Sequence, residues 1–547
     1  KAFKLSSDLT KKEAINYNYY QTDTIKDNNA SIKMYMKGIK EHEKQTFLDN
    51  VGPFIDPENK KRFFHMDYYR YYLKYDVLVL KHGMIKYNQT MIDTFGKPIF
   101  DFLTISSYAD DYFKSRGVYD EMYECKGGLK KFLGLAVYGG RVNVCKEFKK
   151  KVINKTLNDY DGVSLYSTSI KRLCDENGVA IGKCKRINED IIVENQNYYV
   201  VSVEITKINK KQQNPFIAQK TKDSLNYINE IPEGEKLIVV IDKHTLEDYI
   251  KFHQIEYTII DGVYYDSGFN NQFKIICDVF NERKKQKALK TPEGDIKQGL
   301  YKLIMNSAYG KTLMKSDNEK DYIVKDVDFN TYLYNNFNTI KHAKKLNDKQ
   351  YIITQQEPDE SYNRASAGIA ILSYSKRIMN EVMGLASDNN INIYYQDTDS
   401  MHMEDDKVKD LEGLFKAEYN RELTGKELGQ FHCDFSHENP TAKNIVSVKS
   451  IFLGKKSYID YLEGTLPDGT KSYCVHSRMK GINEIAKDNE ALKQDGESMN
   501  DKMFGLYEDL ANDYTIEFVL NPESKPSFKF TSEGVRLIKS GTFKREV

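Results

Sequence analysis

Apolar residues recur at helical spacing in three separated parts of the chain. They are residues 60–90, 269–313 and 364–388. Apolar and aromatic positions three and four residues apart are typical of a helix with one buried face. The second region is interrupted at Thr291-Pro292-Glu293-Gly294, where proline and glycine predict a break. The pattern therefore predicts three helical regions, the second of them in two pieces.

Between these helices, β-branched and aromatic runs predict strands. The runs occur at 155–166, 198–266, 391–403 and 446–463. The first should end in a polar turn, and 391–403 should form a hairpin. A glycine-rich turn interrupts the apolar stretch 126–147, and the tail from residue 476 mixes both patterns. The interleaving of helices and strands predicts an α+β fold.

The bulk composition narrows the class of protein without indicating a function. With 40% hydrophobic and 29% charged residues over 547 positions, the chain is ordinary for a globular protein of several domains. No apolar run approaches the roughly 18 residues that span a bilayer, so we expect no membrane association. Seven scattered cysteines without a CxxC pair favour a reducing, intracellular compartment. A zinc site at His432, Cys433 and His437 is disfavoured, because no second ligand pair has suitable spacing.

Local charge is more informative than the net charge of +1. Basic residues cluster at 146–155, 207–222, 283–290 and 341–349, several of them beside Tyr, Phe or Asn. Such clusters suit phosphate contacts with some base stacking. They are equally typical of solvated faces in a Lys-rich chain, so charge alone leaves nucleic-acid binding open.

Two short segments have carboxylates where strands are predicted to end. Asp161 follows a strand-like run, and Asp397 and Asp399 lie at the tip of the predicted hairpin. Carboxylate oxygens suit hard cations, and a divalent ion relieves the repulsion between neighbouring carboxylates. Taken alone, each segment is also explained by a surface aspartate or an ordinary polar turn. Together they predict a metal site.

A third segment has polar groups on one helical face. Lys302, Asn306 and Tyr309 are spaced i, i+4 and i+7. The lysine can meet phosphate charge, the tyrosine offers a flat face to a base pair, and Gly310 allows close backbone approach. The alternative is a partly buried amphipathic helix. Because this segment lies between the two carboxylate segments, the combination predicts nucleotidyl transfer with two metal ions.

Two further positions suit contact with a sugar or a primer strand. Tyr166 can pack beneath an incoming sugar and exclude a 2′-hydroxyl, the group that distinguishes ribose from deoxyribose. Lys456 and Tyr458, two apart on a predicted strand, would share one face and could hold a primer end. Taken alone, these residues read more simply as a core tyrosine and a solvated strand face.

Together the segments resemble the signature of the family B DNA polymerases. The pattern is Dx₂SLY from Asp161, Kx₃NSxYG from Lys302, YxDTDS from Tyr395 and KxY from Lys456. The resemblance covers residues 60–490 and is closest to the protein-primed branch of phages, adenoviruses, linear plasmids and virus-like transposons. Residues 137–140 resemble that branch's YxGG segment, with valine where the pattern has its tyrosine. Serine at 167 stands where the family usually has proline.

The resemblance implies a role for each matching residue. Asp161 and Asp399 would bind two Mg²⁺ ions, or Mn²⁺ in their place, assisted by the Gly162 carbonyl. Asp397 would be a supporting catalytic carboxylate, and Tyr166 would select the deoxy sugar. Nucleotide contacts are expected from Lys302, Asn306, Tyr309, Lys290 and Lys297. DNA contacts are expected from Tyr138, Gly139, Gly140, Arg141, Lys456 and Tyr458.

The resemblance also implies a right-hand polymerase fold of palm, fingers and thumb, preceded by part of an RNase H-like 3′–5′ exonuclease domain. Tyr72 and Asp76 match the third exonuclease motif, YxxxD, whereas no NxxxFD segment is found and the DxE at Asp56 lies too close. We therefore expect an N-terminally shortened chain that does not proofread. The expected divisions are an exonuclease remnant (1–100), a connection (101–155), the first palm segment with a priming-type insertion (156–268), fingers (269–315), the second palm segment (316–462) and a thumb (463–547).

The expected reaction is template-directed addition of a deoxynucleotide to a 3′-hydroxyl, to replicate the linear DNA of a virus or mobile element. The expected partners are template and primer DNA, dNTPs and a terminal protein whose hydroxyl starts synthesis. A monomer is expected, in the cytoplasm, the host nucleus or a viral factory. Two alternatives stay open: a nucleic-acid-primed family B polymerase, and a non-catalytic DNA-binding fragment. A reverse transcriptase fits less well, because its hairpin is usually YxDD.

Overall fold

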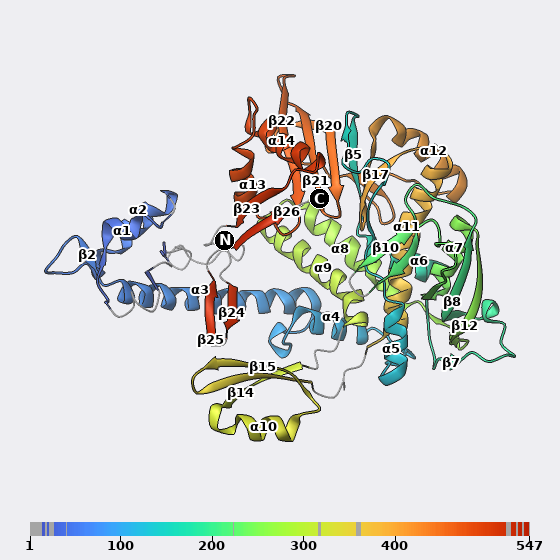
Figure 1. The fold of residues 1–547 in the computed structure, drawn as a ribbon, viewed down its shortest axis with the longest axis horizontal. Coiled ribbons are helices and arrows are strands. Elements are labelled where there is room, and N and C mark those ends of the chain that lie inside the picture. The colour runs from blue at the N-terminus through green and yellow to red at the C-terminus, as the bar shows by residue number, and fades with distance from the viewer. Residues whose placement is uncertain are drawn as a thin grey trace. The chain divides into compact units, whose positions relative to one another are not determined.

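The computed structural model divides the chain into two compact units (Figure 1). One combines residues 1–112 with 279–307, and the larger combines 113–278 with 308–547. The structure describes residues 14–16, 19–20, 27–39, 41–221, 224–314, 319–356, 363–520, 527–531, 534–538 and 541–545. The α+β class predicted from the sequence is confirmed.

The smaller unit is built around one long helix. α3 (His65–Phe95) confirms the helix predicted at 60–90 and ends at Gly96, whose φ of 85° only glycine adopts readily. An aromatic core packs against its N-terminal end: Tyr35, Phe47, Phe63 and Tyr68. The other elements before residue 115 are β1 (Ala30–Ser31), α1 (Ile32–Met36), α2 (Lys44–Asn50), β2 (Arg62–Phe63) and α4 (Ile105–Lys114).

The break predicted near residue 291 is the start of a new helix. α8 (Ile276–Ala288) is followed by α9 (Pro292–Gly310), and Thr291 Oγ1 accepts the Gly294 N–H at 3.0 Å. A proline at the first helical position after a threonine cap is typical of a helix N-terminus. Tyr301 of α9 contacts Phe95 edge-on, with ring centroids 5.1 Å apart, so α9 packs at the end of α3.

The larger unit is centred on a nine-stranded antiparallel sheet in the part of the chain that is described. Its order is β22-β21-β20-β5-β18-β17-β3, with β19 beside β5 and β4 beside β20. The predicted strand is β5 (Leu157–Gly162), and the predicted hairpin is β17 (Ile393–Asp397) with β18 (Ser400–Glu404). The others are β3 (Val142–Val144), β4 (Val152–Ile153), β19 (Phe431–Cys433), β20 (Lys443–Gly454), β21 (Ser457–Thr465) and β22 (Lys471–Met479).

Helices of the larger unit pack against this sheet and against one another. α11 (Ala365–Asp388), predicted at 364–388, is buried along most of its length and contacts α6 (Leu165–Glu176) and α7 (Lys243–His253). The main hydrophobic core includes Val382 of α11 and Met401 of β18. The remaining helices are α5 (Gly127–Leu135), α12 (Val408–Tyr419), α13 (Glu484–Ala491) and α14 (Met499–Ala511), the last of which packs on β20, β21 and β22.

The strand-rich stretch 198–266 is here called the insertion. Its strands β8 (Tyr198–Ile208), β11 (Leu237–Asp242) and β12 (Ile255–Tyr265) form a separate sheet with β7 (Lys185–Arg186), in the order β11-β8-β12-β7. A hairpin of β9 (Ile217–Lys220) and β10 (Leu225–Ile228) contacts β11. Helix α7 was not predicted, although Asp242 caps it by accepting the Thr245 N–H at 3.1 Å.

His253, the last residue of α7, predicts a loss of stability in acid. Its ring is fully buried, Nε2 accepts the Phe216 N–H at 3.0 Å, and burial lowers its pKa to about 4 from about 6.5. Because the folded chain then binds fewer protons than the unfolded chain, stability falls as the pH drops from about 6.5 to about 4, by up to about 3 kcal/mol. Thermal unfolding across this range should show the loss. His253→Gln should flatten it, and equal slopes in both proteins would contradict the assignment.

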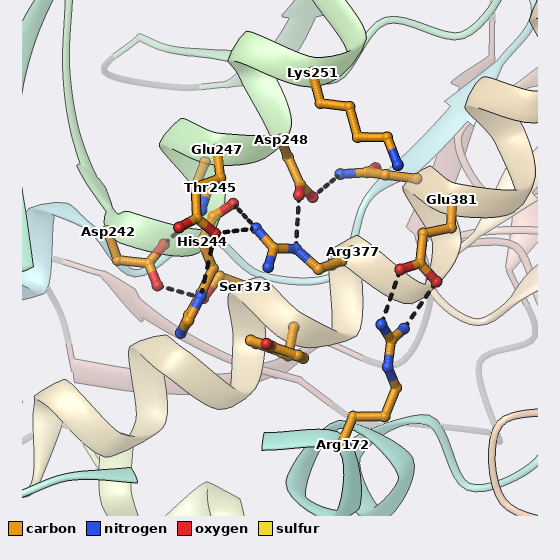
Figure 2. A network of polar contacts seen from close by, with 12 residues as sticks. Arg172, Asp242, His244, Thr245, Glu247, Asp248, Lys251, Ser373, Arg377 and Glu381 are labelled. Atoms are coloured by element: carbon orange, nitrogen blue, oxygen red, sulfur yellow. Dashed lines mark hydrogen bonds and ion pairs between the residues drawn. The ribbon is translucent and has the colours of Figure 1, made fainter. Parts of the chain in front are cut away.

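A buried polar network joins α6, α7 and α11 (Figure 2). Arg377 of α11 donates to Asp248 at 2.7 Å and to Glu247 at 2.8 Å, both on α7. Arg172 of α6 donates to both carboxylate oxygens of Glu381 on α11, each at 2.8 Å. Charge-assisted, two-point contacts of this kind fix orientation as well as distance. The network therefore holds the insertion's helix to the helices of the main sheet.

One segment differs from the sequence prediction. The strand predicted to carry both Lys456 and Tyr458 is not continuous, because β20 and β21 are joined by a tight turn at 455–456. Residues 319–356 form a sheet of their own, with the order β14-β16-β15. Its strands are β14 (Glu319–Lys325), β15 (Ile340–Asn347) and β16 (Gln350–Gln356), and the helix α10 (Phe329–Asn336) lies between β14 and β15 in sequence. The remaining strands are β6 (Val179–Ala180), β13 (Phe269–Asn270), β23 (Ile516–Leu520), β24 (Ser527–Thr531), β25 (Gly534–Ile538) and β26 (Gly541–Arg545).

Candidate active site

Asp161 and Asp399 lie at the same end of the main sheet, where β5 meets the β17–β18 hairpin. In the antiparallel register, Asp161 is opposite Ser400 and Asp397 pairs with Ser400 across the turn. The Gly162 N–H donates to the Asp399 carbonyl oxygen at 2.8 Å. Because a strand register fixes which residues meet, Asp161 is brought beside Asp397 and Asp399, which lie more than 200 positions later in the sequence.

The turn that carries Asp399 is held by the segment before β3. The Thr398 N–H donates to the Arg141 carbonyl oxygen at 2.8 Å. Gly140 lies directly against the Thr398 side chain, since a Cβ at position 140 would come within 2.6 Å of it. Thr398 itself has φ of 62°, a left-handed conformation that β-branched residues rarely adopt. Such a turn persists only when its neighbours hold it in place.

The charges at this site are unevenly compensated. The pKa of Asp399 is raised, first by burial and then by the neighbouring carboxylates of Asp397 and Asp159. Asp397, by contrast, accepts from Lys456 Nζ through both of its oxygens, at 2.7 and 2.8 Å. Lys456 is thus a direct partner of the carboxylate pair, a contact that the sequence did not reveal.

These residues fit a Mg²⁺ site that substrate would complete. Within the described ranges, no three His, Cys, Asp or Glu side chains are grouped so as to enclose a metal ion. Mg²⁺ is usually held by one or two carboxylates, with waters and substrate phosphates completing its shell. Asp161, Asp399 and the Gly162 carbonyl could supply that partial set. The raised pKa of Asp399 agrees, because excess negative charge is what a divalent cation neutralises.

Tyr166 and Tyr309 are stacked on one another. Tyr166 lies in the first turn of α6, and its ring is 4.0 Å from that of Tyr309, with 20° between the planes. Burial raises the pKa of Tyr166, and a hydrogen bond with Tyr309 and the nearby charge of Asp399 raise it further. The structure therefore brings the predicted sugar-selecting tyrosine and base-pair tyrosine together, near the carboxylates.

The remaining predicted nucleotide contacts lie on or before α9. Lys302 and Asn306 are exposed and share one face of the helix, while Ile304 and Met305 on the other side are buried. Lys297 forms an ion pair with Glu293 of the same helix at 3.0 Å. Lys290 is exposed in the loop before α9, with φ of 52°. A common face for Lys302 and Asn306 is what their spacing predicted.

Two of the expected DNA contacts are buried. Only 2% of Arg141 and 7% of Tyr138 are exposed. The Arg141 guanidinium donates to Gln396, and the Tyr138 carbonyl accepts from Lys376 Nζ at 2.6 Å. Gly139 and Gly140 are exposed. The prediction that the Arg141 and Tyr138 side chains contact DNA does not agree with this burial, whereas the two glycines offer accessible backbone.

The expected primer contacts also differ from their predicted geometry. Lys456 is in the turn between β20 and β21, with φ of 57°, and so does not share a strand face with Tyr458. Tyr458 is buried in an aromatic cluster with Tyr395 and His402, at centroid distances of 4.8 and 5.4 Å. Its ring therefore packs the core beneath the site, and Lys456 alone of the pair presents a charged group beside the carboxylates.

Two residues near the site were missed by sequence reasoning. The Tyr395 hydroxyl accepts the Lys456 N–H at 3.0 Å and lies 3.4 Å from Asp397 Oδ2. His402 is fully buried on β18, with Nε2 3.2 Å from Asp460, and the charges of Asp159 and Asp460 outweigh burial and raise its pKa to about 9. Tyr395 opens the YxDTDS segment and could have been singled out. His402 has no sequence signal, because its partners are distant.

The exonuclease-like residues lie on α3. Tyr72 and Asp76 are one helical turn apart, and Asp76 is exposed.

In the described part of the molecule, no helix combines the length and hydropathy that a membrane span requires.

Comparison with known proteins places these features in a family. Residues 1–404 match the family described as DNA polymerase type B, organellar and viral. A DNA polymerase of the yeast Kluyveromyces lactis is 22% identical over 469 residues, which are 83% of this chain and 43% of that protein. The chain thus spans less than half the length of this curated relative.

The fold is similar to that of phi29 DNA polymerase. In complex with primer-template DNA, that enzyme superposes with a TM-score of 0.60 at 16% identity, over 90% of this chain and 74% of its own. In complex with single-stranded DNA the TM-score is 0.57 at 17% identity, over 90% and 73% of the two chains. The polymerase fold predicted from the motifs is confirmed by this likeness.

Proposed function

Since the chain belongs to the organellar and viral type of family B DNA polymerases, as its motifs predicted, we propose that it is a template-directed DNA polymerase that adds dNTPs to a 3′-hydroxyl. The observation that carries the proposal is the meeting of Asp161, Gly162 and Asp399 at one sheet end. Family B polymerases generally use divalent metal ions. Two Mg²⁺ ions at these residues would supply activation of the attacking hydroxyl and neutralisation of the triphosphate.

The chain's own residues would do the rest by positioning and charge. Lys302 and Asn306 form a polar face suited to a triphosphate, and Lys297 and Lys290 add charge at the start of the same helix. Lys456, now bound to Asp397, would turn to the primer end when DNA enters. Contributions of this kind lower the barrier through orientation and preorganised electrostatics.

The Tyr166–Tyr309 stack would part to admit a nucleotide. With ring centroids 4.0 Å apart, no base or sugar fits between the two rings. We propose that Tyr309 then lies against the nascent base pair while Tyr166 lies under the sugar. This assignment predicts that Tyr166→Val admits ribonucleotides.

The expected change in Tyr166→Val is a rise in rCTP over dCTP incorporation of about tenfold to a hundredfold, because the ring no longer occupies the space of a 2′-hydroxyl. Single-nucleotide incorporation kinetics with each nucleotide would measure it. Tyr160→Phe is a suitable control, because it changes a tyrosine on the adjacent strand that contacts Asp405 instead of Tyr309. Unchanged sugar discrimination in Tyr166→Val would contradict the assignment.

The direct test of the proposed function is primer extension. The purified chain would be given a primed single-stranded template, dNTPs and Mg²⁺, and the products resolved by length. Extension that follows the template sequence would support the proposal. DNA binding without any extension would instead favour the non-catalytic fragment. Trimming of a mismatched 3′ end in the same assay would contradict the expectation that the chain lacks proofreading.

We further propose that synthesis starts on a terminal protein and that the insertion contributes to its binding. The insertion is a sheet of its own, fixed to α11 by the polar network, and such a separate element is a candidate surface for a priming partner. Covalent attachment of a first nucleotide to a terminal protein, without any oligonucleotide, would support protein priming. Activity on oligonucleotide primers alone would favour the other branch.

We include three further points in the same proposal: the domain divisions, a monomeric chain and a reducing intracellular compartment. Residues 156–268 and 316–462 would form the palm, 269–315 the fingers and 463–547 the thumb, after a connection (101–155) and an exonuclease-type segment (1–100) that contains Tyr72 and Asp76. All seven cysteines are free thiols, which suits a reducing compartment.

A further inference from the structure

Arg141 is a buried cation in a segment expected to touch DNA. Its Nε donates to Gln396 Oε1 at 2.7 Å, and its guanidinium carbon lies 4.6 Å from the ring centre of Phe216 and 5.6 Å from that of Tyr227. None of these three partners is a carboxylate that could neutralise the guanidinium charge. Its Nη2 also donates to Met383 Sδ at 3.2 Å, and the nearby charge of Asp248 acts on it without a direct ion pair. The guanidinium is thus surrounded by rings, one amide oxygen and one thioether.

Such burial is not explained by stability. Removing a charge from water is costly unless it is paired, and replacing buried charges by apolar residues of similar volume is often neutral or stabilising. Burial lowers the pKa of Arg141 to about 10, which reflects the same cost. The cost of burying this charge makes a role besides folding stability worth testing.

The contacts of Arg141 converge on the catalytic turn. Its carbonyl oxygen accepts the Thr398 N–H at 2.8 Å, and its side chain binds Gln396, so that it contacts the chain on both sides of Asp397. The residues that follow it in β3 pair with β17, with Val142 opposite Asp397. Its ring partners Phe216 and Tyr227 belong to the insertion segment. Arg141 therefore links the insertion to the strand and turn that carry two of the candidate catalytic carboxylates.

We propose that Arg141 is a positioning residue that fixes the turn from Asp397 to Asp399 against the insertion, and that it affects catalysis through this turn and not by contacting DNA. The catalytic part of this inference rests on the proposed polymerase function, whereas the structural part does not. A left-handed Thr398 needs an external restraint, and the Arg141 carbonyl and side chain supply it from one residue.

The test compares wild type with Arg141→Met, which roughly keeps the side-chain volume, removes the charge and the side-chain hydrogen bonds, and leaves the carbonyl bond to Thr398 in place. Hydrogen exchange would be followed by mass spectrometry in peptides covering 393–404, beside thermal unfolding and primer-extension kinetics. We expect faster exchange in 393–404, a melting temperature that is unchanged or higher, and kcat about a hundredfold lower with primer affinity retained. Arg364→Met is the matched control, because Arg364 is also buried over a tyrosine, at 4.0 Å from Tyr119, but does not touch the turn. It should leave exchange in 393–404 unchanged.

The outcomes separate the two proposals. Faster hydrogen exchange in Arg141→Met would support the positioning role even if the wild-type protein does not extend primers. That failure of the wild type would contradict the polymerase proposal alone. Unchanged exchange in 393–404 would overturn the positioning role, as would a loss of DNA affinity with kcat retained, which would indicate a direct DNA contact. If Arg141→Met fails to fold, Gln396→Met decides: it removes the side-chain amide that accepts from Arg141 and leaves Arg141 itself in place, and it should reproduce the faster exchange of the turn or the inference fails.

Discussion

Asp399→Asn is expected to abolish nucleotide addition, with kcat at least about a thousandfold lower, equivalent to about 4 kcal/mol of transition-state stabilisation. Asparagine keeps the size of the side chain, and the main-chain bond from Gly162 to residue 399 is unaffected. What is lost is one of the two negative charges that would hold divalent ions beside the reacting phosphate. Because the buried carboxylate is already under electrostatic stress from Asp397 and Asp159, its removal should not destabilise the fold.

Primer-extension kinetics and DNA affinity measured on the same preparation would check this expectation. Asp406→Asn provides the control, because it makes the same chemical change seven positions away at an exposed carboxylate. We expect DNA affinity to change less than twofold in both variants, since neither residue is basic. Full extension by Asp399→Asn would remove Asp399 from the site, and equal loss in both variants would point to a general effect of net charge.

The parts of this site that the sequence predicted are those in which local rules act. Asp397 and Asp399 lie in a short hairpin whose strand pattern and polar turn are contained in a dozen residues. The end of β5 at Gly162 is similarly local, and antiparallel pairing of these strands is enough to bring Asp161 beside Ser400. Lys302 and Asn306 share a face because helical spacing alone requires it.

The parts that the sequence did not predict depend on partners that are distant in the chain. Arg141 reads as a basic residue after two glycines, and only the packing of Phe216 and Tyr227 around it reveals that it is buried. The bond between Lys456 and Asp397 spans 59 positions. The turn at Lys456 was missed although Gly454-Lys455-Lys456-Ser457 interrupts the apolar run there, because Lys456 was matched to the KxY motif and assigned to a strand face.

Arg377→Met is expected to destabilise the larger unit by about 3–5 kcal/mol, the largest stability effect that we predict. Arg377 binds Asp248, Glu247 and the His244 carbonyl oxygen, so its removal leaves the buried Asp248 with Asn380 as its hydrogen-bond partner. Burial already raises the pKa of Asp248, and loss of the guanidinium would raise it further. Figure 2 shows that α7 and α11 meet at this contact, so the loss should loosen the insertion.

The pH dependence distinguishes a buried unpaired charge from a simple packing defect. When the pKa of a carboxyl is higher in the folded than in the unfolded chain, the protein becomes less stable as the pH rises above the unfolded-state pKa near 4. The stability lost in Arg377→Met should therefore be larger at pH 7.5 than at pH 5. Thermal unfolding at both pH values would measure it. Arg186→Met is the matched control: Arg186 binds Asp261 at 2.8 Å, but its side chain is 79% exposed, so removing it should change stability far less than Arg377→Met does. Two results would contradict this prediction: equal losses of stability in Arg377→Met and Arg186→Met, or a loss in Arg377→Met that does not change with pH. Either would show that the charged contact between α7 and α11 does not hold the insertion to the rest of the unit.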